Sequence, residues 1–262
     1  MSLIQYFKNV YISRFVLYSL VSKDLKNKYR RSFLGIAWSI LTPLGLVLII
    51  GSVYSIIWGQ DPRVLIPRLF TGLTPWICIS SAAESGAMSF ISAEGYIKQT
   101  LTKIEIFPIR AATVSLINFL YSAIAFFVVY IFISPEKFNL TMLATIPGIL
   151  ILYLFCIGFS SIASIININI RDYQPFQSLL LQACFYATPI IYPSEMLADK
   201  GYSIVYEINP FYYIIEVIKK PMTGDGLPSV QVYLIAVSIS VLLFVIGACA
   251  VNKMGRNIVF KL

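Results

Sequence analysis

The residues LGIAWSILTPLGLVLIIGSVYSIIW, Leu34–Trp58, form a run of 25 residues without a single charged side chain. A helix of about 20 apolar residues crosses the hydrocarbon core of a bilayer, and within it the backbone N–H and C=O groups pair with one another. The run therefore predicts a transmembrane helix.

The composition of the whole chain agrees with that reading. Hydrophobic residues make up 58% of the sequence and charged residues 12%, and the mean hydropathy is +0.80. A soluble domain carries about 25% charged residues. We therefore expect a single all-α transmembrane domain over residues 1–262, with no separate soluble domain.

Five further apolar runs bring the number of predicted transmembrane helices to six. One of them contains Glu84, which is surrounded by small residues. Small residues let helices approach closely, so we expect Glu84 to face protein rather than lipid, bonded to a neighbouring helix, with substrate contact as the alternative. The five runs are Leu69–Ile91, Ile109–Ile133, Leu143–Ile168, Phe176–Tyr192 and Val232–Val251.

The distribution of basic residues predicts the orientation. With the N-terminus inside, 14 of the 20 Lys and Arg residues fall in the predicted cytoplasmic segments, so both termini are expected in the cytoplasm. Residues 1–31 carry apolar side chains at helical spacing beside polar ones, which predicts an amphipathic helix in the cytoplasmic interface. A seventh span is the alternative, and it would place the termini on opposite sides.

The connection at residues 193–228 is far longer than the usual loop of about 4 to 6 residues. Asn209 followed by Pro210 is a helix-start signal, and a largely apolar run follows it. We expect short re-entrant helices that dip into the outer leaflet. A loop packed on neighbouring helices fits the sequence equally well.

Several kinds of chemistry have no motif in this chain. There is no histidine, no C-x-x-C pair among the four cysteines and no G-x-x-x-x-G-K-[ST] phosphate cradle, so neither a metal site nor ATP hydrolysis is expected. The basic residues lie between apolar runs rather than on one face, which disfavours nucleic-acid binding. The chain is thus not expected to be an enzyme, and a transport function would need energy from another subunit.

Three segments carry a family resemblance. The run YRRSFLGIAWSILTP at residues 29–43 closely resembles the opening of the permease subunits of type 2 ABC exporters, in particular those that export lipid-linked polysaccharides. KIEIFP at residues 103–108 is similar to the family's entry to the third span. TPIIY at residues 188–192, with the later Asn209-Pro210, is the third match.

The resemblance implies a homodimer of six-span permeases bound to two ATPase subunits, which would bind ATP and Mg. It implies export of a lipid-anchored glycan such as O-antigen, capsule or teichoic acid across the bacterial inner membrane, through a channel at the dimer interface. The alternatives are a type 2 ABC exporter of drugs or lipids, and a structural membrane protein without a transported substrate.

Aromatic residues make up 15% of the chain, and sugar rings stack on aromatic rings. The first and fifth spans resemble the family's channel helices, so their aromatic residues are the candidates for a glycan channel. The re-entrant region would hold an exit gate. The predicted channel residues are Trp38, Tyr54, Phe185 and Tyr186, and the predicted gate residues are Phe211, Tyr212 and Tyr213.

Residues 92–103 form the longest polar connection on the predicted cytoplasmic side, and the family places its ATPase-coupling helix there. The expected apolar face would bind the ATPase, whereas an ordinary helix resting on lipid headgroups is the alternative. The predicted coupling residues are Glu94, Tyr96, Ile97, Lys98, Thr100, Leu101 and Lys103.

Overall fold

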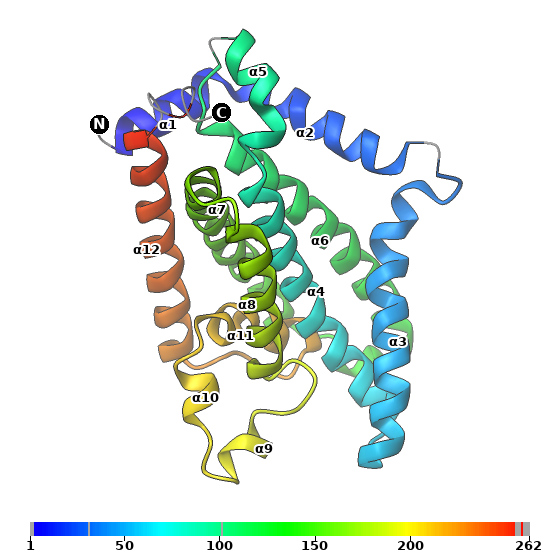
Figure 1. Ribbon diagram of the computed structural model, residues 1–262. Coiled ribbons are helices and arrows are strands. Elements are labelled where there is room, and N and C mark those ends of the chain that lie inside the picture. Colours follow the sequence, from blue (N-terminus) through cyan, green and yellow to red (C-terminus); the bar gives the residue numbers. More distant parts are fainter. Residues whose placement is uncertain (1–2, 31, 101, 255–257, 259–262) are drawn as a thin grey trace.

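The computed structural model describes residues 3–30, 32–100, 102–254 and 258, and the regular structure in these residues is helical (Figure 1). Five helices are long and apolar enough to cross a membrane, which confirms an all-helical membrane architecture. With the 3-10 turns that extend two of them, these helices cover Gly35–Trp58, Pro62–Ala87, Ile106–Ile133, Leu140–Asn169 and Val230–Met254.

These long helices are α3 (Trp38–Trp58), α4 (Pro62–Ala87), α6 (Ile106–Ile133), α7 (Thr145–Asn169) and α12 (Val230–Met254). Helix α4 begins earlier than the predicted Leu69. The Asp61 side chain accepts a hydrogen bond from the Arg63 backbone N–H at 2.8 Å, and Pro62 occupies the first helical position. A search for uncharged runs passes over this start, because Arg63 and Arg68 lie inside the helix.

The predicted fifth span corresponds to α8 (Tyr173–Ala187). Its 15 residues rise about 22 Å, less than the roughly 30 Å of a hydrocarbon core, and it is not among the helices that could cross a membrane alone. The helix ends at Ala187, ahead of Pro189, and the remaining residues to Tyr192 form turns. A sixth crossing therefore stays a prediction.

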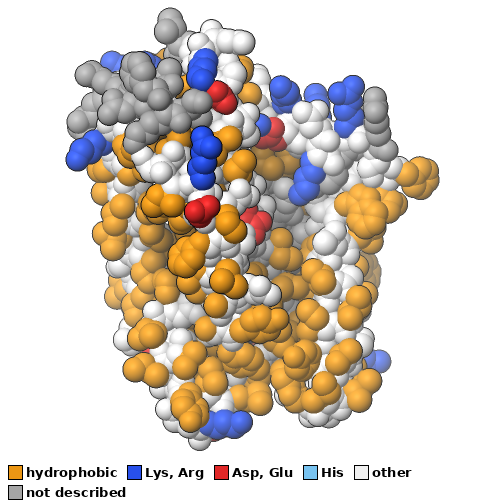
Figure 2. Space-filling view, in the orientation of Figure 1, with side chains coloured by type: hydrophobic (Ala, Val, Ile, Leu, Met, Phe, Trp, Pro, Cys, Tyr) orange, Lys and Arg blue, Asp and Glu red, His pale blue; other side chains and the backbone are white. Residues whose placement is uncertain are grey.

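The N-terminal segment forms two helices, α1 (Leu3–Ile12) and α2 (Arg14–Tyr29), rather than the single helix that was predicted. Both lie across one end of the bundle, and α12 ends there too (Figure 1). Neither is among the candidate membrane spans. Lys and Arg side chains gather at the same end, around α1, α2 and α5 (Figure 2).

Residues 193–228 fold into three short helices, α9 (Glu195–Ala198), α10 (Ile204–Glu207) and α11 (Pro210–Thr223). Helix α11 packs against α4, α7 and α12, and Ile214, Val217 and Ile218 are fully buried. Gly148 of α7 permits this contact, because a Cβ atom there would lie 2.6 Å from the Val217 carbonyl oxygen. The longest connection in the chain thus contributes to the core.

The centre of the bundle is α4, which packs against α3, α6, α7, α8 and α11, while α12 packs against α7. Small residues set the closest approaches. A Cβ atom at Gly158 of α7 would lie 2.5 Å from the Leu243 carbonyl carbon of α12, and one at Gly86 of α4 would lie 2.6 Å from the Ser160 Cα atom. Such contacts give dense helix packing in membranes, where burying apolar surface gains little.

The remaining elements are short connections: η1 (Gly35–Ala37), η2 (Ile91–Ala93), α5 (Glu94–Gln99), η3 (Pro135–Lys137) and η4 (Leu140–Ala144).

Candidate functional site: a hydroxyl-lined cavity beside α3

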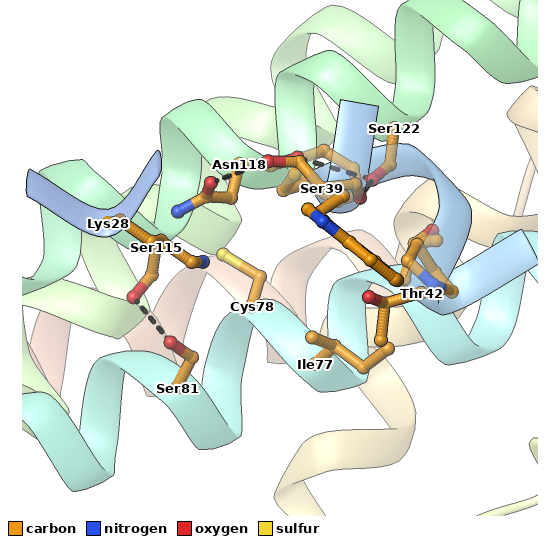
Figure 3. A pocket seen from close by; sticks show the side chains of 13 residues that line it. Lys28, Ser39, Thr42, Ile77, Cys78, Ser81, Ser115, Asn118 and Ser122 are labelled. Carbon is orange, nitrogen blue, oxygen red and sulfur yellow. Dashed lines mark hydrogen bonds between the residues drawn. The ribbon is translucent and has the colours of Figure 1, made fainter. Parts of the chain in front are cut away.

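A cavity of about 280 Å³ lies between α3, α4 and α6, with Lys28 of α2 among its lining residues (Figure 3). Most of its polar groups are hydroxyls, joined by one amide and one ammonium group. The lining residues are Lys28, Trp38, Ser39, Thr42, Pro43, Thr74, Ile77, Cys78, Ser81, Ser115, Asn118, Phe119 and Ser122.

A hydrogen-bond network holds α3 against α6 on one side of this cavity. The Ser39 hydroxyl donates to the Asn118 side-chain oxygen at 3.0 Å, and the Ser122 hydroxyl donates to the Ser39 backbone oxygen at 2.8 Å (Figure 3). On the other side, the Ser115 hydroxyl of α6 donates to the Ser81 hydroxyl of α4 at 3.2 Å. The wall groups are therefore fixed in position, and hydroxyl oxygens keep further acceptor capacity.

Trp38 is the one predicted channel residue that lines this cavity. Its side chain is 48% exposed, and the indole N–H donates to the Ser32 hydroxyl at 3.2 Å. An indole beside several hydroxyls suits a ligand with both flat apolar faces and hydroxyl groups, which is the character of a sugar ring.

The structure does not bring the other predicted channel residues to Trp38. Tyr54 contacts Trp58 near the opposite end of α3, with the ring centroids 4.6 Å apart and the ring planes tilted by 48°. Phe185 of α8 packs on Trp76 of α4 at 5.5 Å. Tyr186 is 63% exposed on the outer face of α8. Helices α3 and α8 lie apart in Figure 1, so a shared channel would require a second copy of the chain.

The predicted coupling segment, residues 92–103, is helical only in part. Helix α5 spans only Glu94–Gln99, and Leu101 lies outside the described residues. Glu94 and Lys98 form an exposed ion pair at 2.7 Å. Thr100 and Lys103 follow the helix, so they do not lie on its face. The Thr100 hydroxyl donates to the Tyr96 backbone oxygen at 2.8 Å, within the turn that ends the helix.

The two large apolar side chains of α5, Tyr96 and Ile97, differ in how deeply they are buried. Ile97 is 6% exposed and belongs to an internal cluster with Phe90 and Phe107, so it anchors α5 to its own chain. Tyr96 is 39% exposed, with its ring 6.3 Å from that of Phe107. The expectation that the entire apolar face awaits a partner is therefore wrong for Ile97, because the loop folds back on the start of α6.

Two polar contacts that the sequence did not indicate fasten the N-terminal helices to the start of α6. The Asn9 amide of α1 donates to the Glu105 carboxylate at 2.7 Å, and both residues are buried. The Arg110 guanidinium donates twice to the Asp24 carboxylate of α2. The only sequence signal for the second pair is an acid within a basic segment and a base at a span entry.

The predicted gate residues lie on the first turn of α11. Phe211 is 9% exposed and contacts the rings of Trp76 at 5.3 Å and Phe155 at 5.8 Å. Tyr212 and Tyr213 are partly buried, and the Tyr213 hydroxyl donates to the Glu207 backbone oxygen at 2.7 Å. The three residues are adjacent, but only Phe211 is held inside the bundle.

Glu84 makes no side-chain hydrogen bond or ion pair with the residues that the structure describes. Its side chain is exposed, near the end of α4 that lies toward α5. The small residues beside it serve the approach of α7 to α4, as the Gly86 contact with Ser160 demonstrates. The expectation of a buried structural role is therefore wrong for the single chain.

Comparison with known proteins gives the family. The ABC-2 type transporter family matches residues 16–222, and the chain belongs to this family. It is 32% identical over 244 residues to an O-antigen export system permease protein RfbA of Klebsiella pneumoniae, covering 91% of this chain and 92% of that protein. A protein of the same description from Myxococcus xanthus is 26% identical, with 92% and 93% covered. The chain is thus an ABC-2 type permease and an integral membrane protein.

Proposed function

We propose that this ABC-2 type permease is the membrane subunit of an ATP-driven exporter that moves a lipid-linked polysaccharide of the O-antigen kind across the bacterial inner membrane. The observation that carries the proposal is its similarity to O-antigen export permeases over more than nine tenths of the chain. The hydroxyl-lined cavity with Trp38 adds chemistry suited to sugar rings.

The proposed conduit lies between two copies of the chain. Helix α8 buries only Gln177 and Leu181, and α3 exposes large apolar side chains along most of its length. Surfaces of this kind on both helices favour a homodimer in which α3 and α8 face the other copy. Trp38, Tyr54, Phe185 and Tyr186 would then line one channel, and α8 with the turns after it would complete a sixth crossing. Both termini would be cytoplasmic.

Energy would enter through α5. The exposed Glu94–Lys98 pair and the half-exposed Tyr96 form the part of this helix that remains available to a partner. Two ATPase subunits would bind ATP and Mg and push on α5. Ile97 would transmit the movement to α6, and the Asp24–Arg110 pair would pass it to α2 and the start of α3.

The exit of the proposed conduit would lie at the end of the bundle opposite α5, where α11 is located. Phe211 is packed on α4 and α7, so a movement of those helices would displace it. Tyr212 and Tyr213 would follow, because they share its helical turn.

Reconstitution tests the function. The permease and the ATPase encoded beside it are placed in vesicles, and ATP hydrolysis and glycan translocation are measured with a lipid-linked O-antigen glycan. We expect stimulated hydrolysis and ATP-dependent appearance of the glycan on the far side. Stimulation by drugs or unglycosylated lipids, with no response to the glycan, would establish the rival exporter class instead.

Coupling is tested in the same vesicles with Tyr96→Asp. A charge at this half-exposed position should reduce co-purification of the ATPase and glycan export by at least about tenfold, as expected when an interface anchor is lost. Tyr11→Asp, at a 67% exposed position on α1, is the control and should keep both. Equal export by the two variants would remove α5 from the proposal.

A further inference from the structure

A second cavity, of about 460 Å³, lies at the end of the bundle opposite α5, between the start of α4, the end of α6 and α11. Five basic and five acidic residues line it, so it is highly charged yet balanced. The basic residues are Arg63, Arg68, Lys137, Lys219 and Lys220, and the acidic residues are Asp61, Glu136, Glu195, Glu216 and Asp225.

Some of these charged residues form ion pairs with one another. Lys137 forms an ion pair with Asp225 at 2.7 Å, and Lys220 forms one with Glu216 at 3.6 Å. Asp61 caps α4. These groups have their charges compensated, and the pairs connect η3 and α11 to the residues around them.

Three cations have no ion-pair partner among the described residues. Arg63 is exposed at the rim, whereas Arg68 and Lys219 lie deeper. The Arg68 guanidinium is partly buried and makes no hydrogen bond or ion pair with any described residue. Lys219 is also partly buried, and its ammonium group donates to the Pro189 backbone oxygen at 3.0 Å. Burial lowers the pKa of Lys219; the Glu216 carboxylate opposes this, and the positive charge of Arg68 reinforces it. An anion beside these two groups would be favourable.

Two acidic residues at the rim of the cavity also lack an ion-pair partner among the described residues. Glu136 and Glu195 are exposed, and neither forms an ion pair among the described residues. The two inner open charges are thus both cations, while the rim carries these two carboxylates and the exposed Arg63 guanidinium.

An apolar cleft of about 70 Å³ adjoins the charged cavity and shares Pro67, Tyr130 and Ile133 with it. Hydrocarbon and aromatic side chains of α3, α4 and α6 line the rest of the cleft: Ile40, Leu44, Ile66, Phe70, Ala125, Phe126 and Val129. Val129 and Ile133 are about half exposed on the outside of the bundle, so the cleft opens toward surrounding lipid. The charged cavity and the apolar cleft therefore share one wall.

We infer that this joined space binds a zwitterionic phospholipid, of the phosphatidylethanolamine type, in the extracytoplasmic leaflet. In such a lipid the phosphate lies next to the hydrocarbon and the ammonium lies farther out. The phosphate meets Arg68 and Lys219, the ammonium meets Glu136 and Glu195, and one acyl chain enters the apolar cleft. The balanced charge disfavours a head group that carries only negative charge.

Lipid retention by the purified full-length protein tests the site without any ATPase or glycan, so the result is independent of the proposed transport function. The protein is exchanged into detergent with phosphatidylethanolamine, phosphatidylglycerol or polyprenyl phosphate, and bound lipid is counted by native mass spectrometry. We expect phosphatidylethanolamine to be retained at least about fivefold more than the other two. Preference for phosphatidylglycerol would overturn the inference, as would a preference for polyprenyl phosphate that Arg68→Gln abolishes, or displacement of the lipid by inorganic phosphate at equal concentration.

Matched variants locate the binding. Arg68→Gln should lower phosphatidylethanolamine retention about tenfold, as expected for one charge-assisted contact, while Lys200→Gln, an exposed change outside the cavity, should not alter it. Ala125→Phe should fill the apolar cleft and lower retention, whereas Ile124→Phe, at a 62% exposed neighbouring position, should not. Equal losses in variant and control would overturn the assignment.

Glu195→Gln supplies a test that leaves the buried packing intact, because the Glu195 side chain is exposed. This variant should shift the preference from phosphatidylethanolamine toward phosphatidylglycerol. If the folded variant kept its preference for phosphatidylethanolamine, Glu195 would not contribute to the site, and the proposed selectivity for a zwitterionic head group would be wrong.

Discussion

The interior helices α4 and α7 differ from the outer helices α3 and α8 in what holds them. In the most apolar 18-residue window of α4, 67% of the residues are buried, against 22% in the window of α3. Glycine and serine bring the interior helices into backbone contact, whereas α3 is held to α6 through Ser39, Ser122 and Asn118. Close packing thus makes a rigid centre, and the outer helices keep faces available for a partner or a substrate.

The largest effect is expected where interior backbones touch. Gly158→Leu would force a side chain into the Leu243 backbone of α12 and should cost at least about 3 kcal/mol of unfolding free energy. Gly45→Leu on α3, where no atom lies within 4 Å of the added Cβ, should leave stability unchanged or raised. Unfolding in detergent measures both, and equal losses would end the distinction between the two regions.

Within α8, replacing a buried residue should cost more stability than replacing an exposed one. Leu181→Ala on α8 removes a side chain that is 4% exposed and should cost about 2 to 4 kcal/mol. Tyr186→Ala on the same helix, at a 63% exposed position, should change stability by no more than about 0.5 kcal/mol. A large loss at Tyr186 in the isolated chain would show that α8 has a partner within that chain.

The tie between α3 and α6 should be weaker than the interior contacts. Asn118→Leu removes the acceptor of the Ser39 hydroxyl and should cost about 1 kcal/mol. Asn27→Leu, an exposed change on α2, is the matched control and should be neutral. Cysteine cross-linking between α3 and α6 should report looser spacing in Asn118→Leu alone; unchanged spacing would show that packing, not this network, positions α3.

At Trp38 a small effect on stability is expected together with a clear effect on transport. Trp38→Ala should change unfolding by less than about 1 kcal/mol, because the indole is half exposed, and should lower glycan export about tenfold through loss of sugar stacking. Phe132→Ala, at an 83% exposed position on α6 outside the cavity, should retain export. Normal export by Trp38→Ala would disconnect the cavity from the substrate path.

Local features of the sequence sufficed for much of the architecture. Apolar runs identified the five long helices, and Asn209-Pro210 identified the start of α11, where the Asn209 side chain caps the Phe211 backbone N–H as expected. The segment at residues 29–43 identified the family that the comparisons confirmed. These signals work because helix formation and capping depend on neighbouring residues in the chain.

Features that depend on distant residues were missed or misread. Ile97 was expected to face a partner, but it packs beside Phe107; Glu84 was expected to be buried, but it is exposed. The two cavities combine residues from several helices, and the Ser39–Asn118 bond joins positions 79 apart. The local hint of the first cavity was the group of polar residues in the third predicted span, Ser115, Asn118 and Ser122.

The sequence by itself therefore determined that the chain is helical, lies in a membrane and belongs to a transporter family, because each follows from local hydrophobicity or from motifs. Only the tertiary structure decided which face of each helix is buried, how α11 enters the core, and where open charges meet an apolar cleft. Those properties arise from contacts between helices, and a rotation of one helix by a single residue position, about 100°, would rearrange them while the hydrophobic pattern stayed the same.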